Sequence, residues 1–284
     1  MKAHWGALAA ARHCAVERRP FRIGPAVVGS VAEAHLPALA RWPHWLAVHP
    51  GAIELRVGAD ARDTALAAIN ARLRAEGLIR AWRDETYPVL ARTGGAPLAL
   101  IERASARFWG TLTFGAHCNG FVADATGRPT HLWIARRALT KATDPGKLDN
   151  LVGGGVPHGQ TPFETLLREG FEEAGLDEAT MRRATPGRVI ELRCDIAEGF
   201  MHERLHTFDL ALPDDLTPRN QDGEVAELHR WPVADAIERA AAGEMTVDAA
   251  LVTLDFALRH GLLAAGDAVD LAPRMAALCV AAVE

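Results

Sequence analysis

The chain is poor in cysteine, in long apolar runs and in excess basic charge, and each scarcity excludes a class of protein. Its 4 cysteines lie far apart without a CxxC pair, which argues against a structural zinc site and against a disulfide framework. The longest apolar run, residues 275–283, is about half of the ~20 residues that a membrane-spanning helix needs. We therefore expect a soluble, cytoplasmic protein without a membrane partner.

The charge balance is mildly acidic. Lys and Arg number 31 against 36 Asp and Glu, which gives a formal net charge of −5. Non-specific binding to a nucleic acid relies on a broad basic surface, so we expect no nucleic-acid partner. A small phosphorylated ligand stays compatible with this balance because it needs only a few local cations.

The length of 284 residues, with 49% hydrophobic side chains, predicts two domains with substantial cores. We place the boundary near residue 112 and predict a small α+β domain over residues 1–112. The Ala-rich N-terminus, residues 1–19, is expected to form a first helix, since Arg12 and His13 make it a weak secretion signal. The next predicted elements are extended segments at 21–31 and 52–57, a helix over 61–76 that stops at Gly77, and short strands at 87–91 and 98–101.

Residues 113–284 are expected to form the second domain. Alternating apolar residues and turn signals predict strands, and apolar residues at helical spacing predict helices. The predicted strands are 114–124, 129–137, 188–194, 204–211 and 225–231, and the predicted helices are 162–174, 233–242, 247–259 and 271–283, with a loop over 138–159.

Residues 148–176 carry the chemistry. Three glycines precede Thr161-Pro-Phe-Glu164, a capping box that specifies a helix start. A 100° helical projection places Glu169, Glu172 and Glu173 together, opposite an apolar face. Carboxylates at this spacing repel one another, and a divalent cation would reverse that repulsion. The apolar face is expected to comprise Phe163, Leu166, Leu167, Gly170, Phe171 and Ala174.

This segment resembles the Nudix box, G-x5-E-x7-R-E-U-x-E-E-x-G-U, where U is aliphatic. Seven of the nine fixed positions match, and the departures are Gln160 for Glu and Gly170 for an aliphatic residue. In Nudix enzymes the Glu at the first of these positions typically pairs with the box Arg. We expect Gln160, or Glu164 one turn before Arg168, to replace that partner. The aligned positions are Gly154, Gln160, Arg168, Glu169, Gly170, Glu172, Glu173, Gly175 and Leu176.

Segments outside the box are similar to one branch of this family, the thiamine-pyrophosphokinase-related Nudix hydrolases. FGAHCNGFVAD, LWIARRALTKATDPGKLDNLVGGG and LVTLDFALRHG carry the likeness, and PFRIG and GLIRAWRDETYPV resemble the DUF4743-type N-terminal domain of that branch. The resemblance implies an α+β chain with a small N-terminal domain, then a Nudix α/β/α sandwich with a mixed sheet and extra C-terminal helices. It also implies a metal-dependent diphosphohydrolase, and relatives that act on thiamine diphosphate and its oxidised analogues to give the monophosphate and phosphate.

The family pattern implies a site that holds Mg²⁺ or Mn²⁺. Glu169, Glu172 and Glu173 would be metal ligands, with Glu173 nearest the attacking water, and the Gly154 carbonyl would add a ligand. A further carboxylate from a later loop often acts as ligand or general base, and Glu224 is the candidate here. Asp222 and Glu227 are the fallback candidates for that role.

Cations are needed to bind the diphosphate. Arg137 and Lys141 are candidates, whereas strand alternation places Arg136 on the other face. His158, in the glycine loop, and Arg83, from a first domain that we expect to cover the cleft, are further candidates. Surface solvation is the alternative for each of them. His117 and Asn119 could grip a ring or phosphate or simply be packed, and Cys118, without a paired base, is expected to be buried.

Two other functions stay open. A catalytically silent Nudix domain could bind a ligand in a regulatory role, although such domains typically lose box carboxylates and this chain keeps three. An isopentenyl-diphosphate isomerase also uses a Nudix scaffold with Mg²⁺, but it needs a positioned Cys, and LDNLVGGG stands where that Cys segment would be. The oligomeric state is not fixed by the sequence, and a homodimer is compatible with it.

Overall fold

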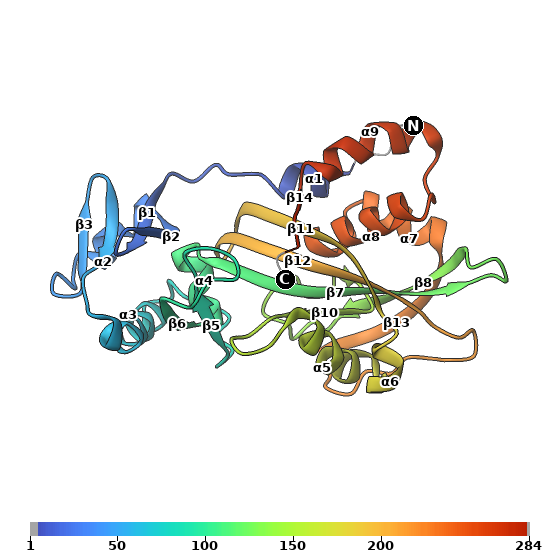
Figure 1. Cartoon of the computed structure of the whole chain (residues 1–284), viewed down its shortest axis with the longest axis horizontal. Coiled ribbons are helices and arrows are strands. Elements are labelled where there is room, and N and C mark those ends of the chain that lie inside the picture. The colour runs from blue at the N-terminus through green and yellow to red at the C-terminus, as the bar shows by residue number, and fades with distance from the viewer. Residues whose placement is uncertain (1–4, 283–284) are drawn as a thin grey trace.

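The computed structural model describes residues 5–282. Two bodies lie side by side in Figure 1: a smaller N-terminal lobe (residues 18–110) and a larger sandwich (residues 112–282). The lobe lies at one end of the long strands of the sandwich. Mixed sheets and helices confirm the α+β class. None of the helices in the described part of the chain is long and apolar enough to cross a membrane.

The N-terminal lobe is built on a small sheet of order β2-β1-β4-β3, in which β1 and β4 are parallel. The single extended segment expected over 21–31 is wrong, because a tight turn at Gly24, with φ +58°, divides it into β1 and β2. The helix predicted over 61–76 is confirmed as α3. The elements are β1 (Arg18–Ile23), β2 (Ala26–Ala32), α2 (Leu36–Leu39), β3 (Leu46–His49), β4 (Ala52–Leu55), α3 (Arg62–Ala75), β5 (Thr86–Val89), β6 (Ala99–Glu102) and α4 (Arg103–Trp109).

Helix α4 closes the lobe and was not predicted. Trp109 is fully buried, its ring lies 4.4 Å from that of Phe21, and its Nε1 donates to Asn70 Oδ1 at 2.8 Å. Phe108 joins the same apolar core. The apolar residues of α4 thus anchor the helix in the lobe, and this fixes the direction in which the side chains of its opposite face point.

The sandwich is a mixed sheet of order β13-β8-β7-β12-β11-β14, with β7 and β12 parallel, β10 paired to β7 and β9 paired to β8. The predicted strands are confirmed with shifted ends, but β9 and β10 fall in the stretch expected to be a loop. The strands are β7 (Leu112–Ala123), β8 (Pro129–Arg137), β9 (Leu148–Asp149), β10 (Val152–Gly155), β11 (Thr185–Ile196), β12 (Gly199–Ala211), β13 (Val225–Pro232) and β14 (Cys279–Val280).

Helices cover both faces of this sheet, as Figure 1 shows. One face carries α5 (Pro162–Ala174) and α6 (Glu178–Met181), and the other carries α7 (Val233–Ala241), α8 (Val247–Arg259) and α9 (Ala265–Ala276). The last helix was expected over 271–283 and instead ends at Ala276, after which Cys279 and Val280 pair with β11. Val283 of that expectation lies outside the described residues.

The chain begins on the sandwich and not on the N-terminal lobe. The first helix, expected over 1–19, is the short α1 (Gly6–Ala10), and residues 1–4 of that expectation lie outside the described part. Trp5, Leu8 and Ala11 are buried in the same core as α8. The backbone amides of Ala15 and Val16 then donate to Asp195 Oδ2 at 2.6 and 2.8 Å, so the connecting segment follows β11 before it enters the lobe.

Candidate active site

Helix α5 begins and ends where the sequence predicted. Thr161 Oγ1 accepts from the Glu164 amide at 3.2 Å, and Glu164 Oε2 accepts from the Thr161 amide at 2.8 Å. Gly175 ends the helix at φ +63°, and a Cβ there would lie 2.6 Å from the Arg219 carbonyl oxygen. Glycine at this position therefore lets the loop that carries Glu224 pack over the helix end.

The burial of the α5 side chains differs from the burial that the helical projection predicts. Leu166, Gly170 and Ala174 are buried as expected, but Phe171 is 60% exposed. On the opposite side Glu173 is only 6% exposed, because β10 covers it. The expectation that Phe171 packs in the core is therefore wrong, since the projection gives the angle of a side chain and not the width of the surface that covers it.

Glu173 is the most deeply buried carboxylate of the box. Its Oε2 accepts from the Gly153 amide at 2.8 Å. Burial first, and then the charge of Glu169, raises the pKa of Glu173 to about 8. A buried carboxylate held ionised needs a compensating cation close by, and this is the condition that a metal ligand meets.

Glu169 lies directly against the glycine strand β10. A Cβ on Gly154 would sit 2.2 Å from Glu169 Oε1, so glycine is required for the carboxylate to lie on this backbone. Burial raises the pKa of Glu169 as well. The first carboxylate of the box and the candidate carbonyl ligand thus belong to one packed unit.

The expectation that Gln160 or Glu164 pairs with Arg168 is wrong. Arg168 Nη2 donates to Glu169 Oε1 at 2.8 Å and its Nη1 to Glu172 Oε2 at 2.7 Å. Gln160 instead accepts from Thr165 Oγ1 at 3.0 Å, and Glu164 is engaged in the capping box. A neutral Gln160 attracts Arg168 less than an ionised partner would, and the carboxylates one residue and one turn further on compete for it successfully.

The donor set fits a hard divalent cation. Carboxylates of Glu169, Glu172 and Glu173 and the carbonyl of Gly154 are the oxygen ligands that Mg²⁺ and Mn²⁺ prefer. Across residues 5–282, no three His, Cys, Asp or Glu side chains form a ready-made metal cluster. Since Arg168 holds Glu169 and Glu172, a metal site here requires that this guanidinium releases them.

Glu224 meets two cations from distant parts of the chain. It accepts from Lys141 Nζ, and Arg83 Nη1 lies 3.2 Å from its Oε1. The Lys141 side chain is 9% exposed, and burial lowers its pKa. The Arg83 amide donates to Glu102 Oε1 at 2.7 Å, so the N-terminal lobe fixes Arg83 in this place. Three predicted site residues are thereby brought together.

Arg137 and Arg136 point in different directions. Arg137 Nη1 donates to Asp149 Oδ2 at 2.7 Å, and its side chain is 14% exposed. Arg136 pairs with the fallback candidate Glu227 at 3.4 Å. The second fallback, Asp222, accepts from the Glu224 amide at 2.8 Å and shapes the turn that presents Glu224.

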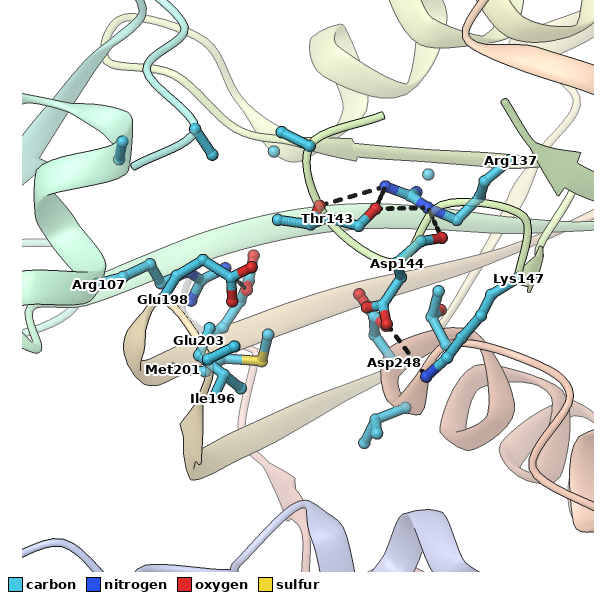
Figure 2. A pocket seen from close by; sticks show the side chains of 18 of the residues that line it. Arg107, Arg137, Thr143, Asp144, Lys147, Ile196, Glu198, Met201, Glu203 and Asp248 are labelled. Atoms are coloured by element: carbon cyan, nitrogen blue, oxygen red, sulfur yellow. Dashed lines mark hydrogen bonds and ion pairs between the residues drawn. The ribbon is translucent and has the colours of Figure 1, made fainter. Parts of the chain in front are cut away.

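A cavity of about 600 Å³ lies between the lobe and the sandwich. Figure 2 shows Arg107, Glu198 and Glu203 on one side of it and Arg137, Asp144, Lys147 and Asp248 on the other. Gly153, Gly154 and Gly155 of β10 form part of its wall. Both bodies of the molecule therefore contribute to one space, which meets the box at Gly154. The side chains of Glu169, Glu172, Glu173, Lys141 and Glu224 lie outside its lining.

His117 is fixed in this wall by a chain of hydrogen bonds. Asn119 Nδ2 donates to Asp209 Oδ1 at 3.2 Å, and Asn150 Nδ2 donates to Asn119 Oδ1 at 3.1 Å. Asn150 Oδ1 is thus left as the acceptor for His117 Nδ1 at 3.0 Å. Because the Asp209 carboxylate only accepts, the chain assigns the proton to Nδ1 of His117 and turns Nε2 toward Asp248, 3.9 Å away.

Two other candidates lie apart from this wall. His158 is exposed, its amide donates to the Thr86 carbonyl at 2.7 Å, and it does not line the cavity. Cys118 is fully buried, which raises the pKa of its thiol, as expected for a packed side chain.

Sequence reasoning missed Arg103, Arg107 and Asp149, which all line the cavity. Asp149 stands in a stretch read as loop, and α4 is too short for a periodic signal. The i, i+4 spacing of Arg103 and Arg107 was the available sign that both share one helix face.

Comparisons with known proteins agree with the match of α5 to the Nudix box. A NUDIX domain model matches residues 114–251, and a domain of unknown function, DUF4743, matches residues 3–113. Nudix hydrolase 24, chloroplastic, from Arabidopsis thaliana is 38% identical over 205 residues, which are 72% of this chain and 56% of that protein. The chain thus spans just over half of the length of this relative.

Two further relatives match about half of this chain. The NUDIX domain of Shewanella oneidensis NrtR, solved with ADP ribose, superposes with a TM-score of 0.41 at 13% identity over 54% of this chain and 90% of that one. An uncharacterised Nudix hydrolase, orf19, from Rhodococcus erythropolis is 30% identical over 151 residues, 52% of this chain and 77% of that protein. With seven of nine box positions, this extent of similarity shows that the chain belongs to the Nudix hydrolase family.

Proposed function

We propose that this protein is a divalent-metal-dependent diphosphohydrolase that cleaves the diphosphate of a small molecule into a monophosphate and phosphate. The observation that carries the proposal is Glu173, buried against the Gly153 amide of β10, the strand whose glycines line a charged cavity. A buried acidic group without an ion-pair partner of its own destabilises a fold, and a cation at this point would offset that.

The metal would be Mg²⁺ or Mn²⁺, held by Glu169, Glu172, Glu173 and the Gly154 carbonyl. When bound, it supplies charge neutralisation for the phosphoryl oxygens. The protein side chains do the rest. Arg137, freed from Asp149, binds non-bridging phosphate oxygens, and Lys141 holds the Glu224 carboxylate in place.

In the reaction a water oxygen attacks one phosphorus, the bridging P–O bond breaks, and the bridging oxygen leaves with the other phosphate. The water gives one proton to Glu224, whose pairing with Lys141 and Arg83 orients it as general base. That proton is passed on to solvent or to the departing phosphate. Glu173 lies nearest the attacking water in this scheme.

For the substrate we propose thiamine diphosphate or its oxidised analogues, in line with the thiamine-pyrophosphokinase-related branch. A cavity of about 600 Å³ suits a molecule of that size. Its lining carries both signs of charge. Carboxylates of Glu198 and Asp248 suit a cationic ring, and the arginines suit the diphosphate.

One observation favours a second function, a silent ligand-binding module. Arg168 already neutralises Glu169 and Glu172, so two box carboxylates are occupied from within. In such a module Arg168 would stay in place and no cation would bind. The two functions therefore differ in metal binding before they differ in turnover.

The test is a panel of nucleoside, sugar and thiamine diphosphates, including oxidised thiamine diphosphate, with Mg²⁺ or Mn²⁺. We expect phosphate release for at least one substrate and its loss in Glu173→Gln. Glu178→Gln, which changes an exposed carboxylate on α6, is the matched control and should keep full activity. No release across the panel, together with no Mn²⁺ binding by calorimetry, would establish the silent module.

A further inference from the structure

The N-terminal lobe presents a row of arginines to the cavity, and three of them form ion pairs. Arg103 Nη1 donates to Glu85 Oε2 at 3.1 Å within the lobe, and Arg83 and Arg107 pair with Glu224 and Glu203 of the sandwich. Among the described residues that line the cavity from this lobe, every charged one is an arginine: Arg80, Arg83, Arg103 and Arg107. The acidic lining residues all come from the sandwich, for example Asp149, Glu198 and Asp248. The paired carboxylates hold these guanidinium groups beside the glycine strand, and donors that each carboxylate leaves free can bind an anion in the cavity.

Helix α4 holds two of these arginines in a fixed direction. Arg103 and Arg107 are one turn apart, so both side chains leave the same face. The opposite face is locked by Trp109 in the core of the lobe. At the helix start the half-buried carboxylate of Glu102 accepts from the Ala104 amide at 2.7 Å and also from the Arg83 amide. One carboxylate thus aligns Arg83 with α4.

The lobe is docked rigidly against the sandwich at this helix. Gly199, in the tip of the β11–β12 hairpin, packs so closely that a Cβ would lie 2.4 Å from the Arg107 carbonyl oxygen. Arg107 Nη2 donates to Glu203 Oε2 on β12 at 2.6 Å. The row of arginines therefore has a defined position relative to β10, which pre-organisation of a binding site requires.

The same groups carry hydrogen-bonding capacity that the protein leaves unused. Within residues 5–282, neither Arg107 Nη1 nor the hydroxyl of Tyr87 has a hydrogen-bond partner, although both atoms are buried. Tyr87 Oη would lie 2.0 Å from a Cβ built on Gly155, and Arg103 Nη2 would lie 3.0 Å from it. Tyr87 Oη at β10 and Arg107 Nη1, from a side chain that pairs with β12, are thus two unpaired buried donors near the cavity wall, and such donors indicate a missing acceptor.

We propose that Arg103 and Arg107 of the N-terminal lobe bind the diphosphate together with Arg137 and that the lobe thereby supplies part of the substrate affinity. The ligand class is an organic diphosphate, whose non-bridging oxygens accept from the two guanidinium groups while its cleaved bond lies at the Gly154 backbone, the part of the box that lines the cavity. This inference rests on the proposed function and assigns the lobe the role of substrate recognition. Arginine suits this role because its planar fork binds phosphate oxygens two at a time.

The experiment uses the full chain and imidodiphosphate, which is not cleaved, with isothermal titration in Mg²⁺ and again in EDTA. Arg103→Gln and Arg107→Gln should each weaken binding by about ten-fold or more, because each removes a charge-assisted pair. Arg56→Gln changes an exposed arginine of the same lobe away from the cavity and should leave binding unchanged.

A purely structural role for Arg107 predicts a different pattern, and Glu203→Gln separates the two. If Arg107 serves only to hold Glu203, both Arg107→Gln and Glu203→Gln lower the melting temperature and neither changes binding. If Arg107 binds phosphate, Glu203→Gln releases its guanidinium and binding becomes tighter. In turnover, Arg103→Gln should raise KM much more than it lowers kcat.

Unchanged binding in both arginine variants, or no binding of imidodiphosphate by the unaltered protein, would overturn the inference. Failure of the proposed function has a separate signature. If the protein binds imidodiphosphate through Arg103 and Arg107 but cleaves no member of the panel, the role of the two arginines stands and the proposed hydrolase function fails.

Discussion

Helices α4 and α5 approach the glycine strand β10 from different parts of the chain and carry opposite charge. Glu169 of α5 packs on Gly154, and Arg103 of α4 lies beside Gly155. Each helix is anchored by one face and leaves charged side chains on the other. The difference is that the carboxylates of α5 belong to a family motif, whereas the arginines of α4 have no such signature. In the function proposed above, chemistry and recognition are supplied by separate elements, and each can be broken by itself.

The largest expected effect comes from breaking the anchor of α4. Trp109→Ala removes a fully buried ring and leaves the Asn70 side chain without its donor. We expect a loss of about 3–5 kcal/mol in unfolding free energy, measured by urea denaturation. Diphosphate binding should weaken in parallel, although no cavity residue is changed. Unaltered binding in a folded variant would show that the row of arginines does not depend on this anchor.

Glu173→Gln breaks the other side of the comparison. We expect kcat to fall by about 10²-fold or more, because a ligand and its charge are lost, while imidodiphosphate binding through the arginines in EDTA is kept. Single-turnover kinetics with the preferred diphosphate measures this. An active variant would mean that the carboxylate assignment is wrong.

The capping box gives an intermediate effect. Thr161→Ala removes the acceptor of the Glu164 amide and should lower the stability by about 1 kcal/mol, seen in thermal unfolding. Thr126→Ala, at an exposed turn, is the control for loss of a threonine hydroxyl. Equal effects of the two variants would show that the box does not specify the start of α5.

A pH series sharpens the account of Glu173. In the metal-free folded protein its pKa is raised to about 8, mainly by burial, so between the ordinary carboxyl range and pH 8 the folded state binds more protons than the unfolded state. Stability from this group therefore falls as pH rises through that window. In EDTA, the melting temperature of Glu173→Gln minus that of the unaltered protein should increase from pH 5 to pH 8. A constant difference would contradict the burial effect.

The smallest effect is expected at the departure from the box. Gln160→Glu restores an acidic side chain near the start of α5 and should draw Arg168 away from Glu169 and Glu172. Calorimetry should show that Mn²⁺ binds a few fold more tightly. The effect is small because Arg168 contacts the metal ligands and not the metal. Gln160→Ala should not tighten it, and equal behaviour of the two variants would mean that Arg168 does not compete with the cation.

Local signals in the sequence predicted α5 and its carboxylates, because a capping box and a terminal glycine specify a helix without tertiary contacts. The same reasoning failed for Phe171, whose burial depends on how far β10 and β7 extend, and for Gln160, whose partner depends on competition among neighbouring carboxylates. Arg103 and Arg107 could not be found in this way, since only the docking of the lobe at Gly199 brings them to the glycine strand.

The central claim is that α5 performs the cleavage and α4 binds the diphosphate of the substrate, and steady-state kinetics of one cleaved diphosphate tests it most directly. Glu173→Gln and Arg103→Gln are compared side by side at saturating Mg²⁺. The account predicts that the first variant loses kcat and that the second raises KM by about ten-fold with kcat largely kept. Equal losses of kcat in both variants, or a KM unchanged in Arg103→Gln, would contradict it.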